Sequence, residues 1–183
     1  MALSEDLETI AAAAAAFALP GERVAGVLAT EPPRAGRVYL CVYESESGRA
    51  WLALDDVAQP VRSRTLVRAA LSLSALCEVA EETAGGGDLA ELRARLAELR
   101  RTEAPEGIEQ AEAAAAALES TIQPPPRVAS SDYLDALGAA ARRLEQALGD
   151  DGGSPFAVAM RQAVPVVEDL TADVEQTYKG PLA

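Results

Sequence analysis

The sequence predicts an α+β fold that is predominantly helical, in which a three-stranded antiparallel β-meander (about residues 23–55) packs on a bundle of five to six helices. Apolar and polar residues alternate over the meander, whereas after Pro60 the apolar residues recur at the spacing of a helix. Clusters of Gly and Pro separate the segments. The length fits a single domain over residues 1–183, with the N-terminal helix, meander and central helix in 1–84 and a helical bundle in 85–183.

The first predicted element is an amphipathic helix over about residues 4–18. Ser4 suits the N-cap position, and Leu7, Ile10 and Ala14 fall on one helical face. The acidic residues before the apolar run oppose a signal peptide, which needs a positively charged start. Since no apolar run reaches membrane-spanning length, we expect a cytoplasmic protein with no membrane partner.

Three short segments rich in β-branched and aromatic residues are predicted to be strands: 23–30, 37–44 and 49–55. If Gly48 closes a three-residue loop, Tyr43 pairs with Trp51, and Tyr39, Tyr43 and Trp51 share one face of the sheet. Tyr and Trp suit recognition because they are amphipathic and have few rotatable bonds. We therefore expect this aromatic face to bind a ligand or partner, unless a helix of the chain covers it.

Helices are predicted over 61–84, from about 88, after Pro105, from Ser131 and from Ser154. The last of these helices contains Pro165, which is expected to kink or split it. The segments 124–126 and 150–153 are the expected joints between helices. The apolar stripe of the last helix is predicted to comprise Phe156, Met160, Ala163, Val167, Leu170, Val174 and Tyr178.

The charge balance excludes some partners. There are 29 acidic against 16 basic residues, which gives a net charge of −13. A surface this negative repels the phosphate backbone, so we expect no nucleic-acid partner. The Ala-rich, Lys-poor composition, with Lys179 as the sole lysine, is typical of a GC-rich bacterial genome.

The residue types also limit catalysis. The chain has no histidine, which removes histidine bases, Ser-His and Cys-His pairs and most zinc sites. Cys41 and Cys77 fall on apolar faces and are expected to be buried, reduced thiols. We predict no catalytic residue, and the sequence favours a protein that is not an enzyme.

One carboxylate pattern points to metal chemistry. Glu78 and Glu81 lie three positions apart, as do Glu109 and Glu112, and such pairs on facing helices can hold Mg²⁺. The pattern resembles the metal-binding signature of the all-α nucleoside triphosphate pyrophosphatases, although that family's second motif usually ends in Asp. The resemblance implies a Mg²⁺-dependent nucleotide phosphohydrolase. Acidic residues in the first turns of a helix are the structural alternative.

A second candidate lies where the meander joins the central helix. Arg62, Ser63, Arg64 and Arg68 bring positive charge to a predicted helix N-terminus, which can receive a phosphate or carboxylate. This arrangement predicts a binding site for a small phosphorylated ligand or another anion. Pairing with the chain's own acidic residues is the alternative.

The preferred hypothesis is a non-enzymatic interaction or scaffold protein that displays a small sheet on a helical domain. Its partner is expected to be a second copy, giving a homodimer, or another protein. No cofactor is expected under this hypothesis, and Mg²⁺ belongs only to the phosphohydrolase alternative. The acidic residues near the end of the chain are expected to be solvated helix surface: Glu168, Asp169, Asp173 and Glu175.

Overall fold

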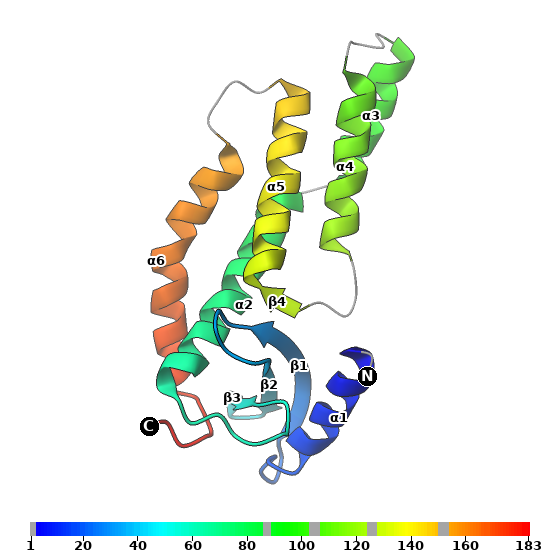
Figure 1. Cartoon of the computed structure of the whole chain (residues 1–183). Helices are drawn as coiled ribbons and strands as arrows, with labels where there is room; N and C mark the ends of the chain where they lie inside the picture. The colour runs from blue at the N-terminus through cyan, green and yellow to red at the C-terminus, as the bar shows by residue number, and fades with distance from the viewer. Residues whose placement is uncertain (1–2, 86–88, 103–106, 124–127, 150–153) are drawn as a thin grey trace. The chain divides into compact units, whose positions relative to one another are not determined.

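The computed structural model describes residues 3–85, 89–102, 107–123, 128–149 and 154–183 (Figure 1). These residues form an α+β fold that is mostly helical, as the sequence predicts. They divide into two compact units, each built from segments that are far apart in the sequence. The first unit is Met1–Ala75 with Pro126–Ser131 and Pro165–Ala183, and the second is Leu76–Pro125 with Asp132–Val164. The expected joints 124–126 and 150–153 lie outside the described residues.

The described helices and strands match the predicted segments closely, with one additional strand. The helices are α1 (Leu3–Ala15), α2 (Arg64–Gly85), α3 (Leu89–Thr102), α4 (Ile108–Ile122), α5 (Ser131–Leu148) and α6 (Pro155–Glu175). The strands are β1 (Arg23–Glu31), β2 (Val38–Ser45), β3 (Gly48–Leu54) and β4 (Val128–Ser130). Pro165 does not split α6, which continues through it. None of the described helices is long and apolar enough to span a membrane.

The antiparallel meander β1–β2–β3 is confirmed, but the sheet has four strands in the order β3-β2-β1-β4. The fourth strand, β4, pairs in parallel with the end of β1, and Ala29 lies opposite Val128. The sheet is therefore mixed. With only three residues, β4 is too short to show the alternation that identifies a strand in sequence.

The predicted register between β2 and β3 is wrong by one residue. Gly48 pairs with Ser45, so the loop has two residues instead of three, and Trp51 lies opposite Val42. Successive side chains of a strand point to opposite faces, so a shift of one residue moves every side chain of β3 to the other face. Trp51 therefore does not share a face with Tyr43.

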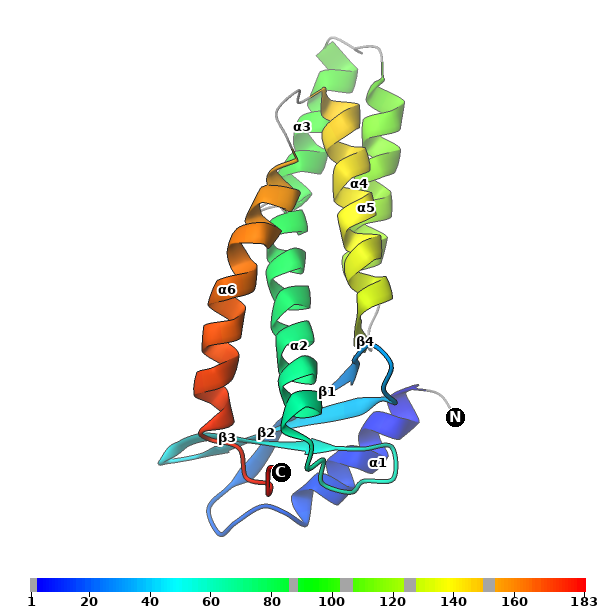
Figure 2. The same cartoon turned by 60° about the vertical axis from the view of Figure 1, so that its left-hand side comes forward.

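Helix α1 covers one face of the sheet (Figure 2). Its buried residues Ile10 and Ala14 pack against a cluster from β1, β2 and β3, and the hydroxyl of Tyr43 donates a hydrogen bond to the carbonyl of Ala14 at 2.8 Å. This packing explains why α1 has a single apolar stripe. The sheet residues of this cluster are Ala29, Tyr39, Cys41, Tyr43, Leu52 and Leu54.

The other face of the sheet packs against the first turns of α2 (Figure 2). Val38, Leu40 and Ala53 point to this side, where Val67 and Ala70 of α2 are fully buried. Since both faces carry apolar side chains, the sheet needs a cover on each side. The cover of this face also includes partly buried residues near the end of the chain: Val174, Tyr178 and Leu182.

A C-terminal segment, residues 176–183, runs along the outer edge of β3. The backbone of Trp51 donates to Thr177 at 3.2 Å and accepts from Lys179 at 2.7 Å. The hydroxyl of Tyr178 donates to the carbonyl of Val61 at 2.8 Å and accepts from the N–H of Ala53 at 3.2 Å. This segment supplies the hydrogen bonds that an edge strand otherwise leaves unmade.

The ammonium group of Lys179 joins this segment to the rest of the first unit. It forms an ion pair with the carboxylate of Glu22 and donates to the carbonyl of Phe17 at 2.9 Å. It also lies 4.0 Å from the centre of the Tyr43 ring, a cation–π distance. Both charged side chains are only 13% exposed, so water screens this pair little.

The second unit is a helical cluster that contains α3, α4, α5, the end of α2 and the start of α6. Many of its buried residues are alanines, which allow helices to approach closely. At Gly138 the approach is especially tight, because a Cβ there would lie 3.1 Å from the ring of Phe156. The buried residues are Ala80, Ala84, Leu96, Ala111, Ala115, Leu118, Leu137, Ala140, Ala141, Leu144 and Phe156.

We predict that Tyr178→Phe lowers the free energy of unfolding by about 1–2 kcal/mol, because the N–H of Ala53 and the carbonyl of Val61 each lose a half-buried partner. Urea unfolding followed by the fluorescence of Trp51, the only tryptophan, measures this change in the first unit. As a control, Thr177→Val removes an exposed hydroxyl that donates to the carbonyl of Val174, three residues earlier, at 2.9 Å, and should have little effect. Equal losses in both variants would contradict the anchoring role of Tyr178.

We predict that the stabilising contribution of Glu22 is lost in acid. The hydrogen bond from Lys179, and secondly that from the backbone of Leu19, lower the pKa of the Glu22 carboxyl from its ordinary value of 4.5. A group whose pKa is lower in the folded state stabilises the protein above its unfolded-state pKa, and this stability is lost as the pH falls through the folded pKa. The melting temperature of the wild type should therefore exceed that of Glu22→Gln near neutral pH.

This difference in melting temperature should shrink as the pH falls below the ordinary glutamate value. The variant Lys179→Met serves as a control, because without the lysine the exchange of Glu22 for Gln should show a weaker acid dependence, of which only the part from the Leu19 hydrogen bond remains. A wild-type advantage that stays constant down to about pH 3 would contradict the linkage.

Candidate functional site

The structure separates the three residues of the predicted aromatic face. Tyr39 and Tyr43 lie under α1 and are 3% and 0% exposed. Trp51 is half-buried on the opposite face, near Tyr178. Burial raises the pKa of the Tyr43 hydroxyl, with smaller contributions from Cys41 and Glu22. The two tyrosines therefore belong to the core of the first unit, and the three aromatic residues do not form one open surface.

The predicted anion site is occupied by the chain's own groups. Arg64 and Arg68 both face the carboxylate of Glu175, at 3.3 and 3.6 Å, and the Glu175 side chain is only 11% exposed. The hydroxyl of Ser63 caps α2 by accepting from the N–H of Leu66 at 3.3 Å. Glu175 is thus not the solvated residue that the sequence suggested, because it neutralises two arginines at the start of α2.

The last residues of the chain contact the same helix start. The carbonyl of Arg62 accepts a hydrogen bond from Ala183 at 2.8 Å, and the N–H of Arg64 donates to the oxygen of Ala183 at 3.4 Å. A helix N-terminus has N–H groups without partners in the helix, and here one of them is satisfied internally. Arg64, Arg68 and Ser63 of the predicted anion site thus use their side chains within the same chain, whereas Arg62 contributes its backbone carbonyl.

The structure does not bring the four predicted metal ligands together. The carboxylate of Glu81 accepts a hydrogen bond from the hydroxyl of Tyr133 at 2.7 Å, while Glu109 and Glu112 face Arg100 of α3. Glu78 is exposed on α2. Within the described ranges, no three Cys, Asp or Glu side chains are arranged to hold a metal ion.

The cysteines are buried, as the sequence predicts. Burial raises the pKa of the Cys41 thiol to about 12. The thiolate is the reactive form of cysteine, so Cys41 is a poor nucleophile at neutral pH.

An open apolar surface lies on α6, in its part within the first unit. Val166 and Leu170, one helical turn apart, are 58% and 55% exposed. On the buried side of the helix, Val167 and Thr171 are 2% and 3% exposed. The apolar stripe predicted from the sequence wrongly placed Leu170 inward, where Thr171 takes its place. The hydroxyl of Thr171 donates to the carbonyl of Val167 at 2.7 Å, so it is buried at little cost.

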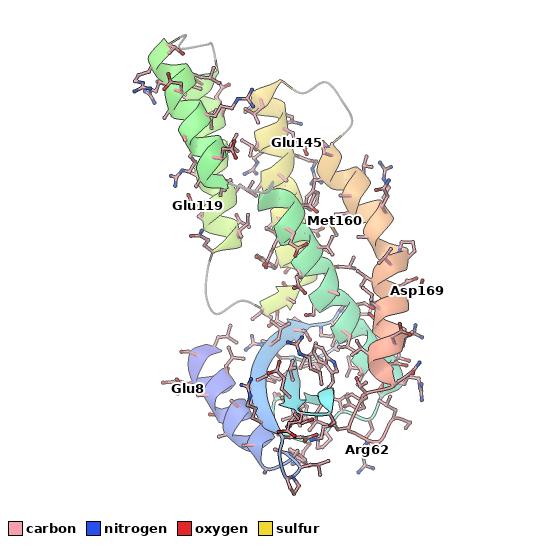
Figure 3. The ribbon with its side chains drawn as sticks, turned by 180° about the vertical axis from the view of Figure 1, so that it is seen from behind. Glu8, Arg62, Glu119, Glu145, Met160 and Asp169 are labelled. Carbon is pink, nitrogen blue, oxygen red and sulfur yellow. The ribbon has the colours of Figure 1, made fainter. Side chains whose placement is uncertain are left out.

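Two carboxylates flank these apolar side chains. Asp169 and Asp173 follow Val166 and Leu170 by three positions each, so each lies beside one of them on the helix surface. Both are exposed, and among the described residues no cation pairs with either. Asp169 points away from α2 (Figure 3). We call Val166, Asp169, Leu170 and Asp173 the α6 face.

We predict that Glu175→Gln destabilises the first unit by about 1 kcal/mol, since its arginine partners are half exposed and water screens the pairs. In a double-mutant cycle with Arg64→Gln, the two losses should not add, because the second change removes a pair that is already broken. Urea unfolding followed by Trp51 fluorescence gives the values. Additive losses would show that the Arg64–Glu175 pair contributes nothing.

The α6 face is the surface that the sequence analysis missed, and it is the candidate site for a partner. The sequence contains a signal for this face, because Val166 and Leu170 are apolar, lie four positions apart and have acidic residues between them. The sequence did not show which of the apolar residues of α6 are buried, and Leu170 was assigned to the buried stripe with Val167. Comparisons with protein-family models, curated proteins and solved structures found no match to this chain.

Proposed function

We propose that the chain is a non-enzymatic interaction protein whose α6 face binds a basic, amphipathic segment of another protein. The observation that carries the proposal is the exposure of Val166 and Leu170, which are 58% and 55% exposed one turn apart on a helix whose other side is firmly buried. A helical surface of this kind can take an apolar segment in the manner of helix-to-groove or helix-to-helix recognition. The buried cysteines fit a reducing cytoplasm as the place of action.

The charge of the α6 face specifies the partner. Asp169 and Asp173 are exposed beside the apolar pair, and the chain as a whole carries a net charge of −13. Complementary charge accelerates encounter and excludes wrong partners. A segment that presents leucine-like side chains flanked by lysine or arginine would satisfy both the apolar and the acidic part of the face.

A second copy of the chain is the less favourable occupant. A symmetric dimer uses the same patch on both subunits. It would bring Asp169 and Asp173 of one subunit close to the same carboxylates of the other, and like charges at an interface are costly. Of the two expected partners, another protein is therefore preferred over self-association.

The available free energy is modest. Full burial of a Val or Leu side chain is worth about 1.5–3 kcal/mol, and here about half of each side chain is exposed. Burying the rest of both residues therefore contributes on the order of 2–3 kcal/mol. This is enough to determine where a partner docks, but strong binding would need additional contacts.

We predict that Leu170→Ser weakens binding of an amphipathic Leu/Lys peptide by about tenfold, because the variant loses most of one apolar contact. Fluorescence anisotropy with a labelled peptide measures the affinity. The matched control is Val57→Ser, since Val57 is 68% exposed in the same unit and lies on the loop after β3, outside the α6 face, and this change should leave the affinity unaltered.

A scrambled peptide of equal composition, without the helical spacing of leucines, should bind more weakly than the amphipathic one. Equal binding of the two peptides would mean that only net charge is recognised, and would contradict the proposal. Sedimentation of the protein alone tests whether a second copy binds the α6 face. If the wild type is a dimer and the Leu170→Ser variant is a monomer, the face belongs to a second copy of the chain.

A further inference from the structure

A pocket of about 600 Å³ opens in the first unit, away from α6. Such a volume lies within the range of small-molecule sites in proteins. Four parts of the chain line it: α1, the end of β1, the turn and first residues leading into β2, and the loop after β3. The lining residues are Asp6, Thr9, Ile10, Glu31, Ala35, Gly36, Arg37, Tyr39 and Asp56.

The charges around the pocket are arranged about Arg37. Its Nε and Nη2 donate to one oxygen of Glu31 at 3.0 and 2.7 Å, and its Nη1 lies 3.5 Å from a carboxylate oxygen of Asp6. The hydrogen bond to Glu31, followed by one with Tyr39, raises the pKa of the Arg37 guanidinium. Arg37 is therefore a partly exposed cation that pairs with two carboxylates at the pocket wall.

The carboxylates of the pocket outnumber its cation. Glu31 and Asp6 use one oxygen each in the bonds to Arg37, so the second oxygen of each carboxylate is not used by it. Asp56 adds a third carboxylate on the loop after β3, and it is exposed and paired with no cation in the part of the chain that the structure describes. The lining thus holds three carboxylates against one guanidinium.

The remainder of the lining is uncharged, and it includes Thr9, Ala35 and Gly36. Ile10 and Tyr39 also line the pocket from α1 and β2, but they are 3% exposed, so only a small part of each side chain is accessible. At Gly36 a Cβ atom would meet no heavy atom within 4 Å, so the space beside this residue is free. A ligand with a short apolar body and a charged end matches this combination of surfaces.

We propose that this pocket binds a small organic cation that carries an ammonium or guanidinium group. The carboxylates of Asp6, Glu31 and Asp56 receive the N–H donors of the ligand, while its carbon chain lies in the open space beside Gly36. An anion is disfavoured because the one guanidinium already binds two carboxylates, and the three acidic groups repel negative charge. The site is independent of the α6 face.

The test titrates the full-length protein with agmatine, which has a guanidinium and an ammonium group on a short aliphatic chain, by calorimetry at about 0.15 M salt. Binding to one site is expected. Asp56→Asn should weaken it by about tenfold, the usual cost of removing one charged hydrogen-bond partner. The matched control is Glu8→Gln on α1, which makes the same charge change at an exposed residue outside the pocket and should leave affinity unchanged (Figure 3).

A second variant distinguishes binding in the pocket from attraction by the overall negative charge of the protein. Gly36→Leu fills the free space without altering any charge, and should abolish agmatine binding while the melting temperature stays near that of the wild type. The proposal would be overturned if Asp56→Asn and Glu8→Gln weakened agmatine binding equally, or if the Gly36→Leu variant bound agmatine as well as the wild type does. Either result would show that the negative charge of the protein attracts agmatine non-specifically. No binding of agmatine, or binding of inorganic phosphate in its place, would overturn it as well.

Discussion

The pairing of Ser45 with Gly48 is the constraint on which the first unit depends. Because the loop between β2 and β3 has two residues, Leu52 and Leu54 point to the same face as Tyr39 and Tyr43. Trp51 and Ala53 then point to the other face, where α2 packs. Both faces are apolar, so α1 and α2 are each required to keep the sheet out of water.

The last part of the chain completes this arrangement and accounts for the predicted anion site. Residues 176–183 cover the edge of β3, and the Lys179–Glu22 pair holds them near α1. Glu175 forms ion pairs with Arg64 and Arg68. The two arginines, which the sequence suggested as an anion site, therefore connect α2 with the end of α6. The two surfaces left open are of different kinds. The α6 face presents apolar side chains beside carboxylates, and the pocket around Arg37 presents carboxylates beside an uncharged lining.

Much of the fold was predictable because it follows from local chemistry. The change of period near Pro60 identified the strands and helices, and turn residues placed most boundaries within a few positions. The strand β4 was not predictable, since three residues carry no periodic signal and its pairing with Ala29 is a long-range contact. Leu170 was misplaced for a related reason. Val167 lies close to both Leu170 and Thr171 on the helix, and only the packing against α2 decides which of them is buried.

The sequence by itself determined the helical segments, the three strands of the meander, the negative charge, the absence of histidine and the burial of both cysteines. Only the tertiary structure decided which charged residues meet. Arg64 and Glu175 are 111 positions apart, and Glu81 and Tyr133 are 52 apart, so no spacing rule relates them. The physical reason is that periodicity reports which side of an element faces the core, whereas the partner of a polar side chain depends on which elements pack together.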